Sequence, residues 1–437
     1  WEELPLGWKR KSLADLVEVR KGKKPAEFQA QSGIDGLPYI DIEAFEKGNF
    51  RRYANQSLGV QVNEEDILIV WDGARSGLVG RGVKGLLGST IAAFRPKETD
   101  KDYLRLFLHS KYDDINTNTR GTGIPHVNPE FLWSLQVPIP PLPEQRRIVE
   151  KLERLLAESR TAREALARVP ALLKHFRQSV LAKAFRGELT ERDPSDEPAS
   201  VLLERIREER RRKWEEGKGV KSKKYVEPEP PDTSGLPELP EGWAWTKLGY
   251  VFDVFTGGTP SRKRNDYWNG SIPWVSSGEV AFGRITDTRE KITNVGLENS
   301  NAKLHPRGTV LLAMIGEGKT RGQSAILDID ATNNQNVAAI VCGETPIPPE
   351  YIFYWLMARY DETRGGSSGG AQPALNGARV KEIPLPLASL AEQHRIFAKI
   401  ESLFAQAEAI ERVVEVARRR AAKVDQAVLA RAFRGEL

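Results

Sequence analysis

The sequence predicts an α+β protein built as an internal repeat: two α/β domains, separated and joined by two long helices that pair as an antiparallel coiled coil. Three observations support this class. Short motifs recur at fixed displacements, a heptad pattern closes each half of the chain, and mixed strand and helix patterns fill the region before each heptad stretch. A repeat of this kind implies an approximate two-fold axis relating the halves.

Three motifs carry the repeat, and each appears once in either half. They are LPLGW at 4–8 with LPEGW at 239–243, EQRRI at 144–148 with EQHRI at 392–396, and AFRGEL at 184–189 with AFRGEL at 432–437. The first pair is displaced by 235 residues and the other two by 248, so the second half holds 13 extra residues between its landmarks. The expected order is a first domain at 1–143, a constant helix at 144–189, a charged helix and linker at 190–235, a second domain at 236–391 and a constant helix at 392–437.

The constant helices follow from spacing. Apolar or small residues recur at alternating steps of four and three in both copies, at Ile148, Leu152, Leu155, Ser159, Ala162, Leu166, Val169, Leu173, Phe176 and Val180, and at Ile396, Ile400, Leu403, Ala407, Ile410, Val414, Ala417, Ala421, Val424 and Val428. This pattern is typical of a coiled-coil seam, and each helix would be about 60 Å long at 1.5 Å per residue. Pro170 predicts a kink or a short break in the first helix. A helical hairpin that only stabilises two domains would show the same pattern.

Each domain contains short apolar strands, such as DILIVWDG from residue 66 and TVLLAMIG from residue 309. Amphipathic helices are expected at 102–115 and 349–363. Between the halves, a short charged helix is expected near 198–216, and the Gly, Lys, Pro and Glu residues after it are typical of a linker. The stretch 205–224 contains ten Lys or Arg against four Glu, a net charge of +6, and it either contacts an acidic partner or is simply solvated.

Composition limits the function classes. The chain has 437 residues, a net charge of +5 and a pI near 9.0, which permit a polyanionic partner. No apolar run reaches the roughly 18 residues of a membrane span and no signal-peptide pattern is present, so a cytoplasmic protein is expected. A single cysteine, Cys342, excludes an internal disulfide, and the five scattered histidines have no metal-ligand spacing.

One glycine-rich stretch, LLAMIGEGKTRG at 311–322, resembles a phosphate-binding loop. Such a loop requires G-x-x-x-x-G-K-[ST], and the first glycine would fall on Ala313. The repeat-related stretch ILIVWDGARSG at 67–77 has Arg75 and Ser76 but no G-K-T. We therefore interpret both as strand-to-turn loops with a basic tip, suited to contact with a polyanion.

Other loops are rich in groups that hydrogen-bond bases or phosphates: RKGKKP at 20–25, NTNTRGTGIPH at 116–126, TGGTPSRKR at 256–264, TNNQN at 332–336 and RGGSSGGAQP at 364–373. Turn formation explains any one of these residues equally well. Phosphate contacts are predicted for Arg75, Ser76, Lys319, Thr320 and Arg321. Base-edge contacts are predicted for Asn118, Arg120, His126, Asn334, Gln335 and Gln372, and Thr259 and Arg262 join the same DNA-binding set. No catalytic or metal-binding residue is predicted.

The combination of LPxGW, GGTP, IPLPxxxEQxxI, AFRGEL and DPSDEPASVLLERIREER resembles the specificity subunit of type I restriction-modification systems, over essentially the whole chain. The resemblance implies two target recognition domains, each reading one half of a bipartite asymmetric DNA site. It also implies that the helices space the domains and dock two modification subunits, which methylate adenine, with ATP-dependent restriction subunits joining them. S-adenosylmethionine, ATP and Mg²⁺ would then bind the partner subunits, and this chain would not be an enzyme.

One position departs from the family pattern. Where the second domain has GGTP at 257–260, the first has GKKP at 22–25, so the first domain's loop is expected to work differently. Two other functions remain open from the residues alone: a partner-independent bivalent DNA-binding protein, and a nucleotide-binding enzyme that uses residues 313–320.

Overall fold

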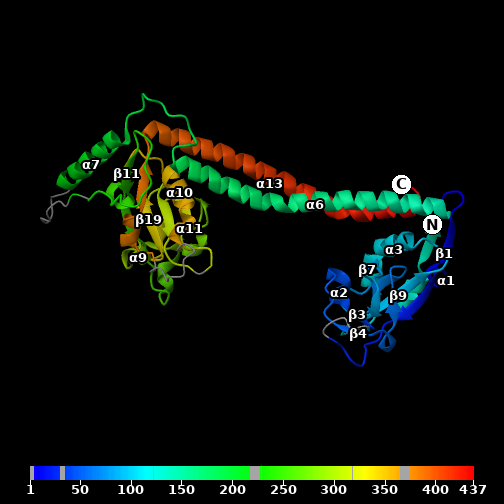
Figure 1. Ribbon diagram of the computed structural model, residues 1–437. Coiled ribbons are helices and arrows are strands. Elements are labelled where there is room, and N and C mark those ends of the chain that lie inside the picture. The colour runs from blue at the N-terminus through cyan, green and yellow to red at the C-terminus, as the bar shows by residue number, and fades with distance from the viewer. Residues whose placement is uncertain are drawn as a thin grey trace. The chain divides into compact units, whose positions relative to one another are not determined.

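The computed structural model describes residues 4–29, 35–121, 123–216, 227, 229–316, 318–364 and 375–437. Its chain forms two compact units, one of residues 1–169 with 413–437 and the other of residues 170–412. Both units mix strands and helices, and the long helices α6 (Leu142–Phe185) and α13 (Leu390–Phe433) each contribute to both (Figure 1). The predicted α+β class, with a repeated domain and paired long helices, is confirmed.

The first unit holds two four-stranded sheets, ordered β2-β9-β6-β7 and β4-β3-β8-β5, and the antiparallel pair β1-β10. Its strands are β1 (Lys9–Ser12), β2 (Val17–Lys21), β3 (Gly36–Ile40), β4 (Tyr53–Asn55), β5 (Gln61–Val62), β6 (Ile67–Val70), β7 (Val79–Arg81), β8 (Gly85–Leu87), β9 (Ile91–Pro96) and β10 (Gln136–Ile139). Its helices besides α6 and α13 are α1 (Leu13–Leu16), α2 (Ile42–Lys47), the 3-10 turn η1 (Gln56–Leu58), α3 (Lys101–Ser110), α4 (Tyr112–Thr117) and α5 (Pro129–Ser134).

The second unit holds a five-stranded sheet, ordered β12-β19-β16-β17-β14, a three-stranded sheet β15-β13-β18 and the pair β11-β20. Its strands are β11 (Ala244–Lys247), β12 (Asp253–Thr256), β13 (Trp268–Val275), β14 (Gly283–Ile285), β15 (Glu290–Ile292), β16 (Val310–Ala313), β17 (Ser324–Leu327), β18 (Thr332–Asn333), β19 (Val337–Val341) and β20 (Pro384–Leu387). Its other helices are α7 (Ala199–Glu216), α8 (Leu248–Val251), η3 (Asn265–Tyr267), η4 (Ser277–Glu279), α9 (Asn294–Glu298), α10 (Pro349–Ala358), α11 (Tyr360–Thr363) and α12 (Gly377–Lys381).

Local sequence explains these elements. The strands β6 and β16 are entirely buried, as their unbroken apolar sequences ILIV and VLLA require of strands covered on both faces. The Asp100 carboxylate starts α3 by accepting hydrogen bonds from the amides of Asp102 and Tyr103, at 3.0 and 3.1 Å. The strands predicted from residues 66 and 309 are confirmed, and so is the charged helix near 198–216, as α7.

The two predicted domain helices are each divided in two. The stretch 102–115 forms α3 and α4, and 349–363 forms α10 and α11. The division falls at Lys111 and Arg359, which lie 248 residues apart and have ψ angles of 6° and 10°. The two domains therefore repeat even this local irregularity.

Each domain is completed by the end of the other copy's long helix. Phe433, from the second AFRGEL motif, packs edge-on against Tyr103 and Phe107 of the first unit, with ring centroids 5.3 Å apart in both cases. In the second unit, Phe185 of the first AFRGEL motif packs against Tyr351 and Trp355, at 5.3 and 5.0 Å. Tyr351 and Trp355 are the counterparts of Tyr103 and Phe107, 248 residues further on, and Phe433 is the counterpart of Phe185. Each domain therefore receives its phenylalanine from the other copy of the helix.

Hydrogen bonds repeat around these aromatic rings. The buried hydroxyl of Tyr103 donates to the Pro138 carbonyl at 2.6 Å, and the hydroxyl of Tyr351 donates to the Pro386 carbonyl at the same distance. Burial without an ionic partner raises the pKa of both phenols far above 10. We call this arrangement of helix-end phenylalanine, tyrosine and proline carbonyl the mount of each domain.

Within each unit, α6 and α13 lie side by side and run antiparallel (Figure 1). Ile148 and Leu152 of α6 share a core with Leu429 of α13 in the first unit, and Val180 shares one with Ile396 in the second. Of the kink or short break expected at Pro170, the break is absent, because α6 is helical from Leu142 to Phe185. A proline lacks only one backbone donor, and the remaining hydrogen bonds of a 44-residue helix hold it together.

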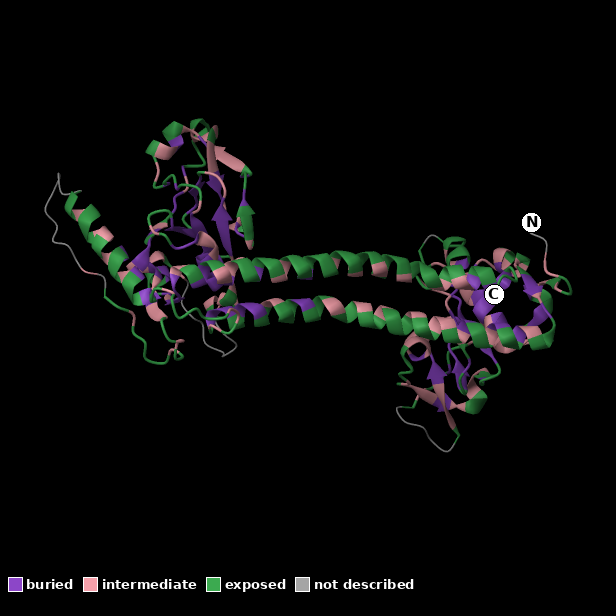
Figure 2. Cartoon of the chain, turned by 90° about the horizontal axis from the view of Figure 1, so that it is seen from above, coloured by how far each residue is buried: buried purple, intermediate pink, exposed green. Residues whose placement is uncertain are grey.

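The predicted seam is correct except at the same two positions of each helix. Ala162 and Phe176 of α6 and Ile410 and Val424 of α13 are exposed instead of lying in the seam. In each case the following residue lies in the seam instead, and these residues are partly buried: Arg163, Arg177, Glu411 and Asp425. Figure 2 shows that residues along the middle of both helices are intermediate or exposed, since two helices alone cannot cover a seam completely.

Candidate nucleic-acid interface

In the second unit, sheet topology gathers three of the predicted DNA-contacting loops at one end of one sheet. Because β19 runs antiparallel to both β12 and β16, its first residues lie beside the last residues of those strands. β17 in turn begins beside the end of β16. The loops after β12, between β16 and β17, and before β19 therefore meet at one edge, which we call the second loop edge.

Close backbone contact joins two of these loops. The amide of Gly258 donates to the Asn333 carbonyl at 2.9 Å, and a Cβ on Gly257 would overlap that same carbonyl oxygen. The GGTP motif thus allows its loop to lie directly against TNNQN. The hydroxyl of Thr259 contacts the side-chain oxygen of Gln335, which places both predicted DNA contacts together.

Arg262, in the same loop, stacks its side chain on two tryptophan rings. Its guanidinium carbon lies 3.7 Å from the ring centroid of Trp268 and 5.2 Å from that of Trp274. The side chain also pairs with Glu290, and hydrogen bonding to this carboxylate raises the pKa of Arg262. Arg262 is half-exposed and is held in place by stacking and by the ion pair.

The glycine-rich loop after β16 is anchored from α11. The hydroxyl of Tyr360 donates to the Lys319 carbonyl at 2.5 Å, and Arg364 donates to the Tyr360 oxygen at 2.7 Å. Arg321 reaches the Thr363 carbonyl at 3.4 Å. Lys319 is exposed at the tip, while Thr320 and Arg321 are partly buried.

This loop does not have the geometry of a phosphate-binding loop. It joins two antiparallel strands, and the amide of Gly322 returns to the Ala313 carbonyl at 2.8 Å. A P-loop places its Lys and Thr at the start of a helix, whose N-terminus faces the phosphates. The geometry therefore favours the interpretation of a turn with a basic tip over the nucleotide-binding alternative.

The first unit has the corresponding edge, formed by the end of β2, the end of β6 and the starts of β7 and β9. We call it the first loop edge. Gly22 approaches the carbonyl of Gly88 as closely as Gly257 approaches Asn333. Lys23 and Lys24 follow Gly22 and are exposed, so this edge presents two ammonium groups where the second presents glycine and threonine.

A segment before α5 extends the first loop edge. The amide of Gly73 donates to the Pro125 carbonyl at 2.8 Å, and His126 Nδ1 lies 2.6 Å from an Asp72 carboxylate oxygen. Arg120 and His126 exchange backbone hydrogen bonds at 2.8 and 2.9 Å. Arg120 and His126 are exposed and lie beside the loop that carries Arg75.

The structure corrects two predicted contacts. Ser76 is fully buried, and its hydroxyl donates to the Gly73 carbonyl at 2.6 Å, so it shapes the loop and cannot reach a phosphate in this conformation. Asn334 is 8% exposed, and its side-chain oxygen accepts from the amide of Asn336 at 3.1 Å, which makes it a turn residue. Both follow the turn-forming alternative that their residue types allow.

The remaining predicted residues are placed as follows. Arg75 is exposed and paired with Glu46, and Arg120 is paired with Glu130. Asn118 is exposed at the end of α4, where its amide donates to the Asp114 carbonyl at 2.8 Å. Gln372 lies outside the described residues.

Sequence reasoning missed two features of the first loop edge. Trp71 follows β6 directly, and Lys21 lies over its ring with the ammonium 4.6 Å from the centroid. Asp72 orients His126. Aligning the two halves through β6 and β16 could have found Trp71, because it occupies the place of the buried Met314.

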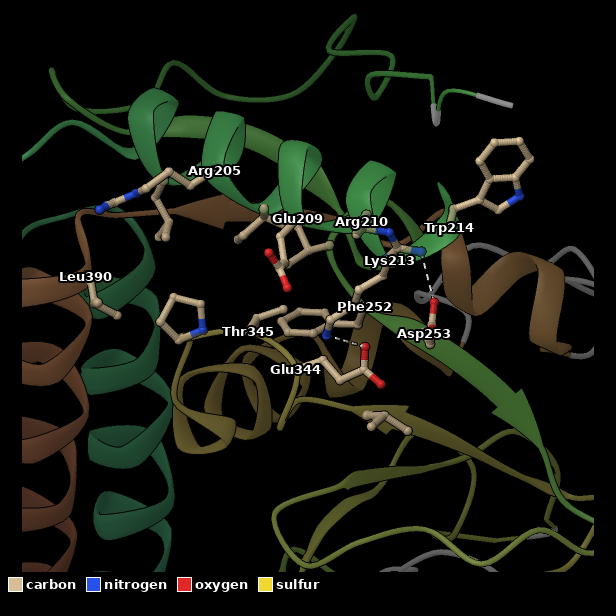
Figure 3. Close-up of a pocket in the computed structure, with 15 residues that line it drawn as sticks. Arg205, Glu209, Arg210, Lys213, Trp214, Phe252, Asp253, Glu344, Thr345 and Leu390 are labelled. Atoms are coloured by element: carbon tan, nitrogen blue, oxygen red, sulfur yellow. Dashed lines mark hydrogen bonds and ion pairs between the residues drawn. The ribbon is translucent and has the colours of Figure 1, made fainter. Parts of the chain in front are cut away.

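A cavity of about 640 Å³ lies in the second unit between α7, the start of β12 and the end of β19 (Figure 3). This is the end of the sheet opposite the second loop edge. Two cationic side chains that line the cavity form ion pairs with other lining residues, Arg210 with Asp253 at 2.9 Å and Lys213 with Glu344 at 3.0 Å. Among the described residues there is no group of three potential metal ligands, and no helix is apolar enough over sufficient length to cross a bilayer.

Comparison with known proteins agrees with this architecture. A family model described as the type I restriction modification DNA specificity domain matches residues 5–169 and again 240–416. The specificity subunit of the type I restriction enzyme EcoBI from Escherichia coli is 28% identical over 98% of this chain and 86% of its own length. The MjaVIII specificity subunit from Methanocaldococcus jannaschii is 25% identical, over 97% of this chain and 91% of its own.

Solved structures share the fold. The crystal structure of an HsdS subunit from Thermoanaerobacter tengcongensis superimposes with a TM-score of 0.62 at 19% identity, covering 100% of this chain and 98% of that one. A chain from a study of assembly and conformational transition of the type I R-M system gives 0.66 at 19% identity, with 100% of both chains covered. Since the family model matches both halves of the repeat and most of the sequence, this chain belongs to the type I restriction modification DNA specificity family.

Proposed function

We propose that this chain is the DNA-specificity subunit of a type I restriction-modification enzyme and reads a bipartite, asymmetric site, one half with each loop edge. The observation that carries the proposal is that topologically equivalent edges present different side chains: Lys23, Lys24 and His126 in the first unit, and Thr259 and Gln335 in the second. Equivalent scaffolds with different hydrogen-bonding groups fit two different half-sites.

The proposed assembly includes the modification and restriction subunits of such an enzyme, with two adenine-methylating modification subunits docked on the paired helices. The curated relatives are specificity subunits, which supports the complex. In this proposal, S-adenosylmethionine, ATP and Mg²⁺ bind the partner subunits and this chain is not catalytic. Because the ligand is cellular DNA, we place the protein in the cytoplasm.

Contacts divide into two kinds. Lys319 and Arg75 stand exposed on loop tips without base-specific geometry, and they suit phosphates. Gln335, Thr259 and His126 have polar groups that suit base edges. Arg262 stacked on Trp268 provides a rigid cation beside them.

The test is selection from a random duplex library with the purified full chain, alone and together with its modification subunits, at one fixed salt concentration. Two short defined blocks separated by a constant unread gap would support the proposal. Strong selection by the chain alone, with no gain from the modification subunits, would instead favour a partner-independent DNA-binding protein. A single block, or none under either condition, would refute bipartite reading.

Variants then assign each loop edge to a half-site. Gln335→Ala should relax one block and leave the other intact, and His126→Ala should do the reverse. Lys319→Ala should weaken binding to all sequences and reduce its salt dependence. The matched control is Arg307→Ala, because Arg307 is exposed just before the start of β16, at the opposite end of the same strand.

A further inference from the structure

Two ion pairs occupy the places where the helix seam departs from its heptad pattern. In the first unit, Arg163 Nη1 of α6 lies 2.7 Å from Asp425 Oδ2 of α13. In the second, Arg177 of α6 makes a bidentate pair with Glu411 of α13, at 2.7 and 3.0 Å. These four side chains are partly buried, so solvent screens them less than it would a fully exposed pair.

The repeat relates the two pairs to each other. Arg163 and Glu411 are counterparts at a displacement of 248, and so are Arg177 and Asp425. The first copy of the helix therefore has arginine at both positions, and the second copy has a carboxylate at both. An exposed neighbour shows the same reversal, with Arg160 in the first copy and Glu408 in the second.

Charge interactions in the second unit agree with this polarity. Hydrogen bonding to Glu411 raises the pKa of Arg177, and the nearby Glu408 adds to the effect. The same hydrogen bond from Arg177 lowers the pKa of Glu411. Both partners are thus fully ionised at neutral pH.

The polarity discriminates between possible helix partners. If two α6 helices from different molecules paired in the observed geometry, Arg163 of one would face Arg177 of the other. Two α13 helices would place Glu411 against Asp425. Like charges in a partly buried seam are repulsive, whereas the apolar seam positions alone are similar in both copies and would accept either arrangement.

We propose that Arg163, Arg177, Glu411 and Asp425 select the helix partner: they direct α6 to pair with an α13-type helix and prevent like helices of two molecules from pairing. The partner that fits α6 is then the other half of the repeat. Each helix pair then joins two different domains and never two copies of the same one. The inference rests on the helix contacts and does not depend on DNA reading.

The test co-expresses two full-length copies that carry different affinity tags and measures how much of the second tag is recovered with the first. One copy is Glu411→Arg with Asp425→Arg, so that both of its helices are positive at these positions. The other is Arg163→Asp with Arg177→Glu, so that both of its helices are negative. Within each copy the helices repel, while between copies every pair is complementary.

Recovery of the second tag should exceed that of two wild-type copies by at least about tenfold, because exchanging helices restores all ion pairs. The matched control carries all four substitutions in one chain, Arg163→Asp, Arg177→Glu, Glu411→Arg and Asp425→Arg. It inverts the polarity without changing complementarity, and two such copies should co-purify no more than wild type.

Recovery from the positive and negative copies that stays at the wild-type level would overturn the proposal. So would co-purification of two copies of the inverted control at the level of the mixed pair, since their ion pairs are complementary within one chain. Neither readout involves DNA, so failure here leaves the proposed function standing, and the library selection can fail without affecting this result.

Discussion

Replacing Phe433 with alanine should destabilise the first unit and leave the second unchanged, although Phe433 belongs to the second copy of the repeat. Its ring is 8% exposed and packs edge-on against Tyr103 and Phe107. Removing a buried phenylalanine costs about 3–5 kcal/mol, and the two aromatic contacts place this position toward the upper end. The counterpart Phe185→Ala should affect the second unit alone.

Hydrogen–deuterium exchange followed by mass spectrometry reads each unit separately. For Phe433→Ala, protection of α3 should fall by roughly three to four orders of magnitude, as expected when about 4–5 kcal/mol is lost from the unfolding free energy. Protection of α10 should not change. Phe185→Ala should give the reverse pattern.

A control variant separates this effect from a general loss of helix stability. Phe176→Ala removes a phenylalanine that is 39% exposed on α6, and it should cost less than about 1 kcal/mol. If Phe433→Ala lowered protection in α10 instead of α3, or changed neither, the reciprocal mount would be wrong.

Three further predictions concern the second unit. Gly257→Ala should cost about 1–3 kcal/mol, because its Cβ would overlap a neighbouring backbone carbonyl, whereas Gly278→Ala has open space and should be neutral; thermal unfolding compares them, and equal melting temperatures would contradict the close approach. His305 is 2% exposed, and its burial lowers the pKa to about 4, so stability should fall as pH drops from 6.5 toward 4. His305→Phe should remove up to about 3 kcal/mol of that dependence in urea titrations, and an unchanged slope would refute the assignment. Tyr360→Phe removes the hydroxyl that holds the Lys319 carbonyl and should weaken DNA binding severalfold with little change in melting temperature; unchanged affinity at fixed salt would show that the loop needs no anchor.

Much of the architecture could be predicted from the sequence because it is periodic. The displacement of 248 and the heptad spacing identified the long helices and most of their seam. The seam failed at Ala162 and Phe176, where an adjacent arginine found a carboxylate on the facing helix. Periodicity describes one helix at a time and contains no information about the charges of its partner.

The loops were less predictable. Residue type suggested hydrogen bonding for both Ser76 and Gln335, but only the folded chain distinguishes a hydroxyl that donates to its own backbone from a side chain that faces solvent. The sequence also did not show which loops lie close together. Thr259 and Gln335 lie 76 residues apart, and the strand order alone brings them together.

The mount has a consequence for how such a protein can diversify. Tyr103 and Tyr351 hold their domains through the same hydrogen bond, and the same motif, AFRGEL, supplies the ring beneath each. The loop edges of the five- and four-stranded sheets share none of these residues. Mutations can therefore change the side chains of a loop edge without altering the mount. In both mounts the helix end contributes the same AFRGEL residues. Recombination can therefore exchange one domain for another while the helix ends that hold it stay the same.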